Sequence, residues 1–146
     1  MKLVIQRVNS ASVTVNKQIT GQIDTGLLIL LGVSKDYTEK KLDWMINKIL
    51  TIKLWHTDEK GFQKNIEEMR GDFLIVSQFT LHGDCTSGTK PNFSKSMESK
   101  KAEEIYNLFI KKLKQKTKRK VETGKFGAMM DVKLENSGPI TIVLEK

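Results

Sequence analysis

The order of apolar and polar residues predicts that the chain begins in β-structure. Residues 2–8 and 11–16 alternate between apolar and polar side chains, which is typical of half-buried strands. Because Asn9-Ser10 lies between these two segments, we expect a hairpin there. Residues 27–33 form an unbroken apolar run, which favours a strand that is buried on both faces. The first quarter of the chain is therefore predicted to be all β.

Strand patterns return after Val121. Residues 124–130 and 132–134 are assigned to strands, and a further strand is predicted over residues 140–144. The last two strands flank the sequence Asn-Ser-Gly-Pro at 136–139. A proline at this place predicts either the turn itself or an edge strand, and X-Pro bonds are the only peptide bonds that are commonly cis.

Two segments between these regions have apolar residues at helical spacing. The first predicts a helix from near Thr38 to near Ile52, with a capping box formed by Asp36 and Glu39. The second has apolar side chains that recur over three turns, at Ala102, Ile105, Tyr106, Phe109, Ile110 and Leu113. The apolar stripe of this second helix is expected to cover a sheet.

The segment 73–81, with the sequence FLIVSQFTL, combines a buried strand with polar side chains at its end. Ser77, Gln78 and Thr80 follow the apolar run directly, so a rigid strand would fix the direction of two hydroxyls and one amide. Such groups are well placed to contact a ligand. The alternative is that Ser77 and Thr80 only satisfy backbone groups where the strand ends.

Length and composition limit the class of protein. A chain of 146 residues fits one domain, 1–146, and can bury roughly two thirds of its unfolded surface in one core. No window approaches the ~20 apolar residues of a membrane span, and the first residues lack the pattern of a signal peptide. We therefore expect no membrane association and a cytoplasmic location. Cys85 is the only cysteine, which excludes an intramolecular disulfide and a cysteine-based metal cluster.

The charge pattern leaves two interpretations open. The net charge is +8, and much of it lies in a lysine-rich run over residues 111–120. Such a run attracts polyanions, including RNA phosphates, but it is equally typical of a solvated helix end. A loop-like segment carries His82, Asp84 and Cys85, although nothing in the spacing indicates a Cys–His pair or another catalytic group.

Several motifs together resemble one family. They are SQFTL at 77–81, VIQRV at 4–8, GLL at 26–28, P-x-F at 91–93, VETG-x-FGA-x-M at 121–130 and NSGPIT at 136–141. In this order and spacing, the chain resembles the D-aminoacyl-tRNA deacylases from end to end. The resemblance implies an α/β fold of one compact domain, in which β-sheets close into a barrel-like body with two main helices packed on one side.

The resemblance also implies an activity and an assembly. Members are homodimeric ester hydrolases that remove D-amino acids, and in many cases glycine mischarged on tRNA-Ala, from tRNA. The active site lies at the subunit interface, because a Gly-Pro pair held cis reaches into the pocket of the partner subunit. Carried over, Ser77, Gln78, Phe79 and Thr80 would form the catalytic pocket floor of one subunit.

The same resemblance assigns the substrate-binding residues. Gly138 and Pro139 would exclude an L side chain near the α-carbon, and Arg7 would brace their loop. The segment from Phe126 to Met130 would receive the terminal adenosine. No metal and no cofactor are implied. In the family mechanism, the 2′-hydroxyl of the terminal ribose activates water, and backbone amides near Phe79 and Thr80 hold the oxyanion. Because the residues show no general base, this mechanism is favoured over nucleophilic attack by Thr80.

Three positions depart from the family pattern. Ser137 stands where an aspartate is expected, the loop 86–90 has few basic residues, and His82 stands where a tyrosine is common. Two alternative functions remain. One is a basic RNA-binding module without catalysis, and the other is an esterase for small amino-acid esters, which predicts no dependence on RNA.

Overall fold

The computed structural model describes residues 1–57 and 61–146. The strands are β1 (Lys2–Val15), β2 (Gln18–Ile23), β3 (Gly26–Gly32), β4 (Trp55–His56), β5 (Phe62–Lys64), β6 (Asp72–Ser77), β7 (Val121–Thr123) and β8 (Asp131–Glu145). Two α-helices, α1 (Glu39–Thr51) and α2 (Ser99–Lys116), and the short 3-10 helix η1 (Phe79–His82) complete the fold. None of the helices in the described ranges is long and apolar enough to cross a membrane.

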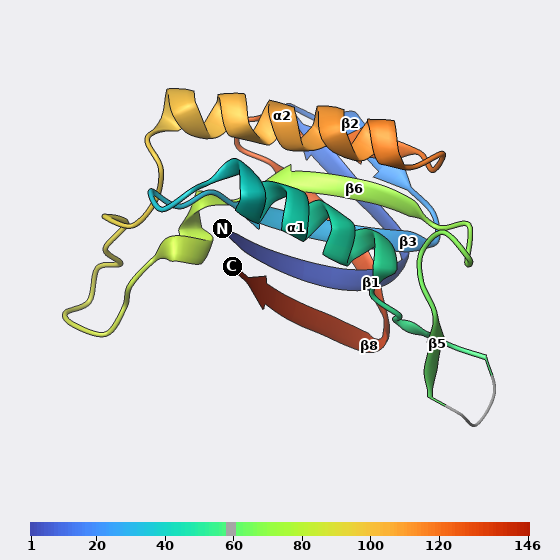
Figure 1. The fold of residues 1–146 in the computed structure, drawn as a ribbon. Coiled ribbons are helices and arrows are strands. Elements are labelled where there is room, and N and C mark those ends of the chain that lie inside the picture. Colours follow the sequence, from blue (N-terminus) through green and yellow to red (C-terminus); the bar gives the residue numbers. More distant parts are fainter. Residues whose placement is uncertain (58–60) are drawn as a thin grey trace.

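The main sheet is built around β1. Its strand order is β2-β1-β3-β6-β7, and β8 pairs with the other edge of β1 over almost its whole length. Pairs that involve β1 are antiparallel, whereas β3 with β6 and β6 with β7 are parallel. Helix α1 packs in front of the sheet and α2 crosses above it (Figure 1). Strands β4 and β5 form a separate hairpin.

The sheet curls until its two ends nearly meet. Strands β2 and β7 lie at opposite ends of the strand order, yet they come into contact. A Cβ atom added at Gly21 on β2 would lie 2.4 Å from the carbonyl oxygen of Thr123 on β7, so only glycine allows this approach. The predicted α/β fold with a barrel-like sheet and two helices is confirmed.

Both faces of the central strands are buried. On β3, Leu27 and Ile29 face the core shared with α1 and α2, whereas Leu28 faces a second core inside the curved sheet. Strand β6 repeats this alternation with Phe73 and Leu74. The unbroken apolar runs in the sequence therefore correspond to strands covered on two sides, as predicted.

The predicted hairpin at Asn9-Ser10 is wrong, because β1 continues through these residues as one strand. Residues 2–8 pair with β3 and residues 11–15 pair with β2, while β8 follows the other edge of both halves. Asn9 and Ser10 thus lie where β1 changes partner. Register shifts against β8 on both sides of Val8 provide the bend.

The C-terminal region also differs from the prediction. The two strands predicted around residues 136–139 are one strand, β8, in which residues 137–140 bulge opposite Arg7 alone. The Gly138–Pro139 peptide bond within this bulge is cis. Residues 124–130 form a loop of turns rather than a strand, with Gly127 at a positive φ of 71°.

Helix α1 begins and ends within one residue of the predicted bounds, but its predicted capping box is wrong. Thr38 is the N-cap, and its hydroxyl accepts a hydrogen bond from the Lys41 amide at 3.3 Å. Asp36 instead contacts the Ser34 hydroxyl and the Lys41 ammonium group. These contacts lower the pKa of Asp36 to about 2.

Candidate active site

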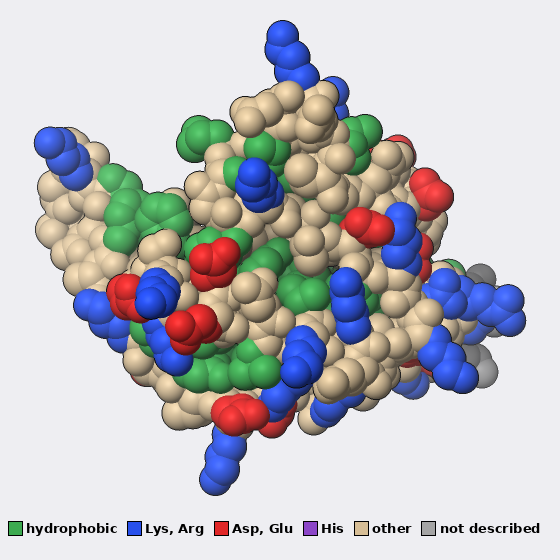
Figure 2. Space-filling model, turned by 90° about the horizontal axis from the view of Figure 1, so that it is seen from above, with side chains coloured by type: hydrophobic (Ala, Val, Ile, Leu, Met, Phe, Trp, Pro, Cys, Tyr) green, Lys and Arg blue, Asp and Glu red, His purple; other side chains and the backbone are tan. Residues whose placement is uncertain are grey.

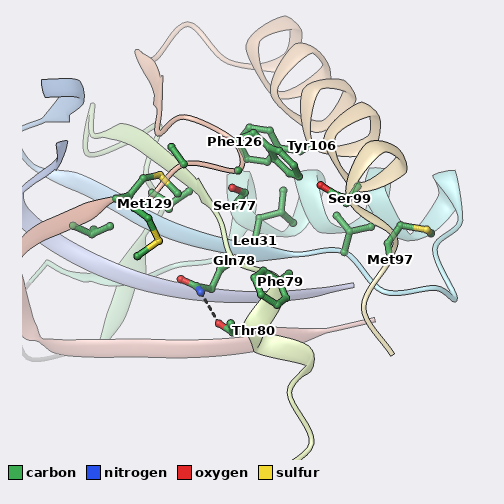
Figure 3. Close-up of a pocket in the computed structure, with 17 residues that line it drawn as sticks. Leu31, Ser77, Gln78, Phe79, Thr80, Met97, Ser99, Tyr106, Phe126 and Met129 are labelled. Carbon is green, nitrogen blue, oxygen red and sulfur yellow. Dashed lines mark hydrogen bonds between the residues drawn. The ribbon is translucent and has the colours of Figure 1, made fainter. Parts of the chain in front are cut away.

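A cavity of about 660 Å³ opens where the carboxyl ends of β3 and β6 meet the beginning of α2. Its walls come from three parts of the chain that are distant in sequence (Figure 3). They are the end of β6 with the start of η1, the first turns of α2 and the loop 126–130. The apolar side chains of Leu31 and Val33 complete the lining.

The segment 77–80 lines one side of this cavity. Ser77 is the last residue of β6 and pairs with Leu31, whose carbonyl accepts a hydrogen bond from the Gln78 amide at 2.8 Å. The side-chain amide of Gln78 donates to the Thr80 hydroxyl at 2.5 Å. Phe79 is 58% exposed and its ring contacts the edge of Phe93. The four residues predicted for the pocket floor therefore lie together at one cavity.

Titratable groups are almost absent from the cavity wall. Among the described residues that line it, only Tyr106 has an ionisable side chain that is relevant to proton transfer. Its hydroxyl donates to the Ile75 carbonyl at 2.7 Å, and burial raises its pKa further above the ordinary value. A phenol held in this way is not a general base near neutral pH.

Tyr106 instead connects three parts of the site. The Ile75 carbonyl accepts both the Tyr106 hydroxyl and the Gly124 amide, the latter at 3.1 Å. The Tyr106 ring also packs against Phe126, with 5.6 Å between ring centroids. Tyr106 therefore fixes α2 against β6 and against the loop on the opposite wall. This role was not predicted from the sequence. The phenol of Tyr106 within the apolar stripe of α2 is the feature that could have indicated it, because a buried phenol needs a hydrogen-bond partner.

The loop 126–130 forms the wall opposite to η1. Phe126 and Met130, which were predicted to receive the terminal adenosine, both line the cavity. Met129 lies between them in the sequence of this loop, and its side chain is 93% exposed. An exposed apolar side chain at the rim of a cavity offers a surface for a planar ligand. Methionine and aromatic side chains therefore surround this end of the cavity.

Arg7, Gly138 and Pro139 do not line the cavity of their own chain. Arg7 pairs with Leu27 at the beginning of β3, whereas the cavity uses Leu31, about 13 Å further along the strand. The Arg7 guanidinium donates to the carbonyl of Ser137 at 3.2 Å and to that of Leu54 at 2.6 Å.

The side chains around the 137–140 bulge hold it in a defined shape. Asn136 accepts a hydrogen bond from the Ile140 amide at 2.9 Å and donates to the Ile140 carbonyl at 3.2 Å. Gly138 has a φ of 122°, and a Cβ atom added there would lie 3.0 Å from Arg7 Nη2. Both Gly138 and Pro139 are exposed. The bulge is therefore an ordered, outward-facing feature on a different part of the surface from the cavity.

His82, Asp84 and Cys85 do not form a reactive group. His82 is buried against Gly32, burial lowers its pKa, and its Nε2 atom has no partner in the described part of the chain. Asp84 accepts hydrogen bonds from the amide and hydroxyl of Thr86, and Cys85 is exposed. Within the described ranges, no group of His, Cys, Asp and Glu side chains has the arrangement of a metal site.

Comparisons with known proteins identify the family of the chain. Residues 4–145 match the family described as D-Tyr-tRNA(Tyr) deacylase. The D-aminoacyl-tRNA deacylase of Thermosipho melanesiensis is 46% identical over 145 residues, which cover 99% of this chain and 97% of that protein. The enzyme of the same name from Aquifex aeolicus is 42% identical, with coverage of 99% and 97%.

Solved structures have the same fold. The c-Myc DNA Unwinding Element Binding Protein superposes with a TM-score of 0.94 at 39% identity, over 100% of this chain and 99% of that one. A probable eukaryotic D-amino acid tRNA deacylase superposes with a TM-score of 0.81 at 18% identity, over 98% and 97% of the two chains, and this likeness concerns the fold alone. On the family match and the full-length relatives, the chain belongs to the D-Tyr-tRNA(Tyr) deacylase family.

Proposed function

We propose that this chain hydrolyses the ester bond of D-aminoacyl-tRNA and so releases a free D-amino acid and tRNA. Membership of the deacylase family and full-length relatives that carry this enzyme name support the reaction class. The observation that carries the proposal is the cavity at the end of β6, where Gln78, Phe79 and Thr80 face the loop 126–130. The whole chain, 1–146, would act as one catalytic domain among cytoplasmic tRNAs.

The composition of the cavity wall favours a mechanism in which the substrate assists its own hydrolysis. Ester hydrolysis requires an activated water, a proton acceptor and donors for the oxyanion. The described cavity wall offers no carboxylate or imidazole as acceptor. The 2′-hydroxyl of the terminal ribose is then the group that helps to activate water. The Phe79 and Thr80 amides stand in the first turn of η1, where amides lack intrahelical partners, and can hold the oxyanion.

This mechanism predicts that Thr80→Ala keeps substantial activity, within about tenfold of the wild type. The Thr80 hydroxyl accepts from Gln78 and has no base beside it among the described residues, so it is a poor nucleophile. Single-turnover deacylation of D-Tyr-tRNA measures the effect. A near-total loss of turnover in a variant that unfolds at the wild-type temperature would contradict the substrate-assisted mechanism.

Selection against L-amino acids is proposed to require a second copy of the chain. Gly138 and Pro139 are exposed and lie away from their own cavity, while Arg7 and Asn136 hold them in place. In a homodimer, this bulge would enter the partner's cavity and collide with an L side chain, whereas a D side chain would point away. Glycine offers no side chain to reject, so glycine mischarged on tRNA-Ala is an expected second substrate.

Exposed apolar side chains on β8 support such an assembly. Val143 is 63% exposed and Leu134 is 38% exposed, and they stand on either side of the bulge along the same strand. Apolar side chains exposed along one strand are a feature of surfaces that a partner covers. The proposed homodimer places a second copy on β8, so that the cavity of that copy receives Gly138 and Pro139.

The alternative is a nucleic-acid-binding module without catalysis. It draws support from the net charge of +8 and from the solved relative that is named for DNA binding. A pure binding module has no need for an ordered Gly-Pro bulge or for a deep cavity with an amide and a hydroxyl in its wall. These features favour the hydrolase.

The decisive experiment compares D-Tyr-tRNA and L-Tyr-tRNA as substrates of the purified protein in the presence of a chelator. Rapid cleavage of the D ester alone is expected. Gly138→Ala is expected to cleave neither ester, because its added methyl group would meet Arg7 and Ile140 and would displace the bulge inside the partner's cavity, where it would block the substrate. Free D-tyrosine methyl ester tests the small-molecule esterase and is expected to remain intact. If neither tRNA ester is cleaved while tRNA still binds, the chain is a binding module and the proposed reaction is wrong.

A further inference from the structure

The basic residues between 111 and 120 divide into two sets according to their contacts. Lys112 binds Glu39 and also Asp43 of α1, the latter at 2.8 Å. Lys116 donates to the Asn47 side chain at 2.8 Å. These side chains join α2 to α1, so their charges are used within the fold.

The two basic residues nearest to β7 are also engaged. Arg119 donates to the Gly71 carbonyl at 3.2 Å and pairs with Asp72 at 3.5 Å. Lys120 donates to the Gln22 carbonyl at 2.9 Å. Both side chains hold the connection from α2 to β7 against the sheet, so their charges are engaged within the fold.

The second set consists of Lys111, Lys114 and Lys118, which are exposed and have no hydrogen bond or ion pair with any described residue. Lys111 and Lys114 are three positions apart on the outward side of α2, and Lys118 follows two residues beyond the end of the helix, in the connection to β7. Figure 2 looks down on the side of the molecule that α2 covers, and basic side chains project from several places on this side.

Lys111 and Lys114 stand on the helix that lines the cavity, and Lys118 follows the end of that helix. Ser99, Ala102 and Tyr106 in the first half of α2 line the cavity, and Lys111 lies about 18 Å from Ser99 along the helix axis. A tRNA whose terminal nucleoside enters the cavity must leave the rest of its acceptor arm outside. A few unpaired nucleotides are long enough to connect the cavity with the far half of α2.

We propose that Lys111, Lys114 and Lys118 form a phosphate-binding stripe that contacts the acceptor arm of tRNA beside the active site. The inference rests on the proposed function, because it uses the cavity as the place of the aminoacyl end. The half of α2 nearer to the cavity carries Lys100 and Lys101 together with Glu103 and Glu104, and Glu104 pairs with Lys101 at 2.8 Å, so these charges cancel. Attraction for phosphates is therefore concentrated away from the ester, on the half of the helix that a duplex stem would reach.

The test replaces the three lysines by glutamine in one protein, Lys111→Gln/Lys114→Gln/Lys118→Gln. A matched control, Lys17→Gln/Lys53→Gln/Lys64→Gln, removes the same charge from exposed positions outside α2. Binding of uncharged tRNA is measured by filter retention at several salt concentrations. The stripe variant is expected to bind about tenfold more weakly, and the slope of log K against log salt is expected to fall by about 2 to 3, since each lysine neutralises one phosphate. For the control variant, we expect neither the tRNA affinity nor the salt slope to change by more than twofold from the wild-type value.

Kinetics separate this role from catalysis. With D-Tyr-tRNA, the stripe variant is expected to show a raised KM and an unchanged kcat, because the lysines lie outside the cavity. Equal tRNA affinity and equal salt slopes in the stripe variant and the control would overturn the proposal. If the wild type cleaves no ester, the proposed function fails, yet the binding measurement still decides whether this stripe contacts RNA.

Discussion

At the scale of single residues, Tyr106 connects several parts of the site through its hydroxyl and its ring. Tyr106→Phe removes the hydrogen bond to the Ile75 carbonyl but keeps the ring against Phe126. Because the carbonyl retains the Gly124 amide, we expect a loss of about 1 kcal/mol in the free energy of unfolding. We also expect kcat to fall severalfold without a change in the shape of the pH–rate profile, since the phenol takes no part in proton transfer.

Tyr106→Ala serves as the comparison, because it removes the ring as well. It should lower kcat further than Tyr106→Phe and raise KM, as the support for Phe126 is lost. Urea unfolding and steady-state deacylation measure both variants. A Tyr106→Phe protein of wild-type stability that has lost all turnover would assign the phenol a chemical role and contradict this account.

His82 makes the stability of the fold depend on pH. Burial lowers its pKa below the ordinary value of 6.5, and its Nε2 atom has no partner among the described residues. As the pH falls below 6.5, the unfolded chain binds a proton that the folded chain resists, so the free energy of unfolding decreases until the pH passes the lowered pKa. Above 6.5, this contribution to stability is fully present.

We therefore expect the wild type to lose more stability between about pH 7.5 and about pH 5.5 than His82→Tyr, which has no group that titrates in this range. The urea midpoint at each pH provides the measurement. The N-terminal amine, whose pKa burial also lowers, is present in both proteins. Parallel pH dependences in the two proteins would show that His82 is not responsible.

At the scale of elements, apolar periodicity predicted strand and helix identity well but failed where strands change partner. The alternation across residues 2–16 is the same whether Asn9-Ser10 turns the chain or lies in a strand that passes from β3 to β2. Likewise, Gly138-Pro139 interrupts the pattern of β8 without ending the strand. Such outcomes depend on long-range pairing, which local propensity does not contain.

The closure between β2 and β7 depends on Gly21. Alanine there would place its methyl group 2.4 Å from the Thr123 carbonyl oxygen, and backbone on both strands must then move. We expect Gly21→Ala to lower the free energy of unfolding by about 1 to 3 kcal/mol. Gln22→Ala, an exposed neighbour on β2, is the control and should cost less than about 0.5 kcal/mol. Equal urea midpoints for the two variants would contradict the role of this contact.

At the scale of the whole molecule, sequence reasoning selected segments that folding brings together, but it did not predict the layout of the cavity. Segments 77–80 and 126–130 were selected as motifs, and folding brings both to one cavity. The wall from α2 was missed, because Ser99 and Ala102 have ordinary side chains that only the packing of α2 places there. Nor does sequence distinguish Lys112, which is bound to α1, from Lys111, which faces solvent.

The separation of the Gly-Pro bulge from the cavity allows the proposed dimer to be tested by complementation. If each active site combines the cavity of one subunit with the bulge of the other, two different inactive variants can restore one site between them. Ser77→Phe fills the cavity floor, and Gly138→Ala disturbs the bulge. In a heterodimer of the two, one site contains both changes and the other contains neither.

Random exchange of subunits makes half of the dimers heterodimers, so a refolded equimolar mixture should recover about a quarter of the wild-type D-Tyr-tRNA deacylation. The mixture before exchange, which contains only the two homodimers, is the control and should remain inactive. If the bulge acts on the cavity of its own chain, every subunit carries a defect, and exchange restores nothing. Recovered activity would therefore require both the dimer and an active site that two chains share.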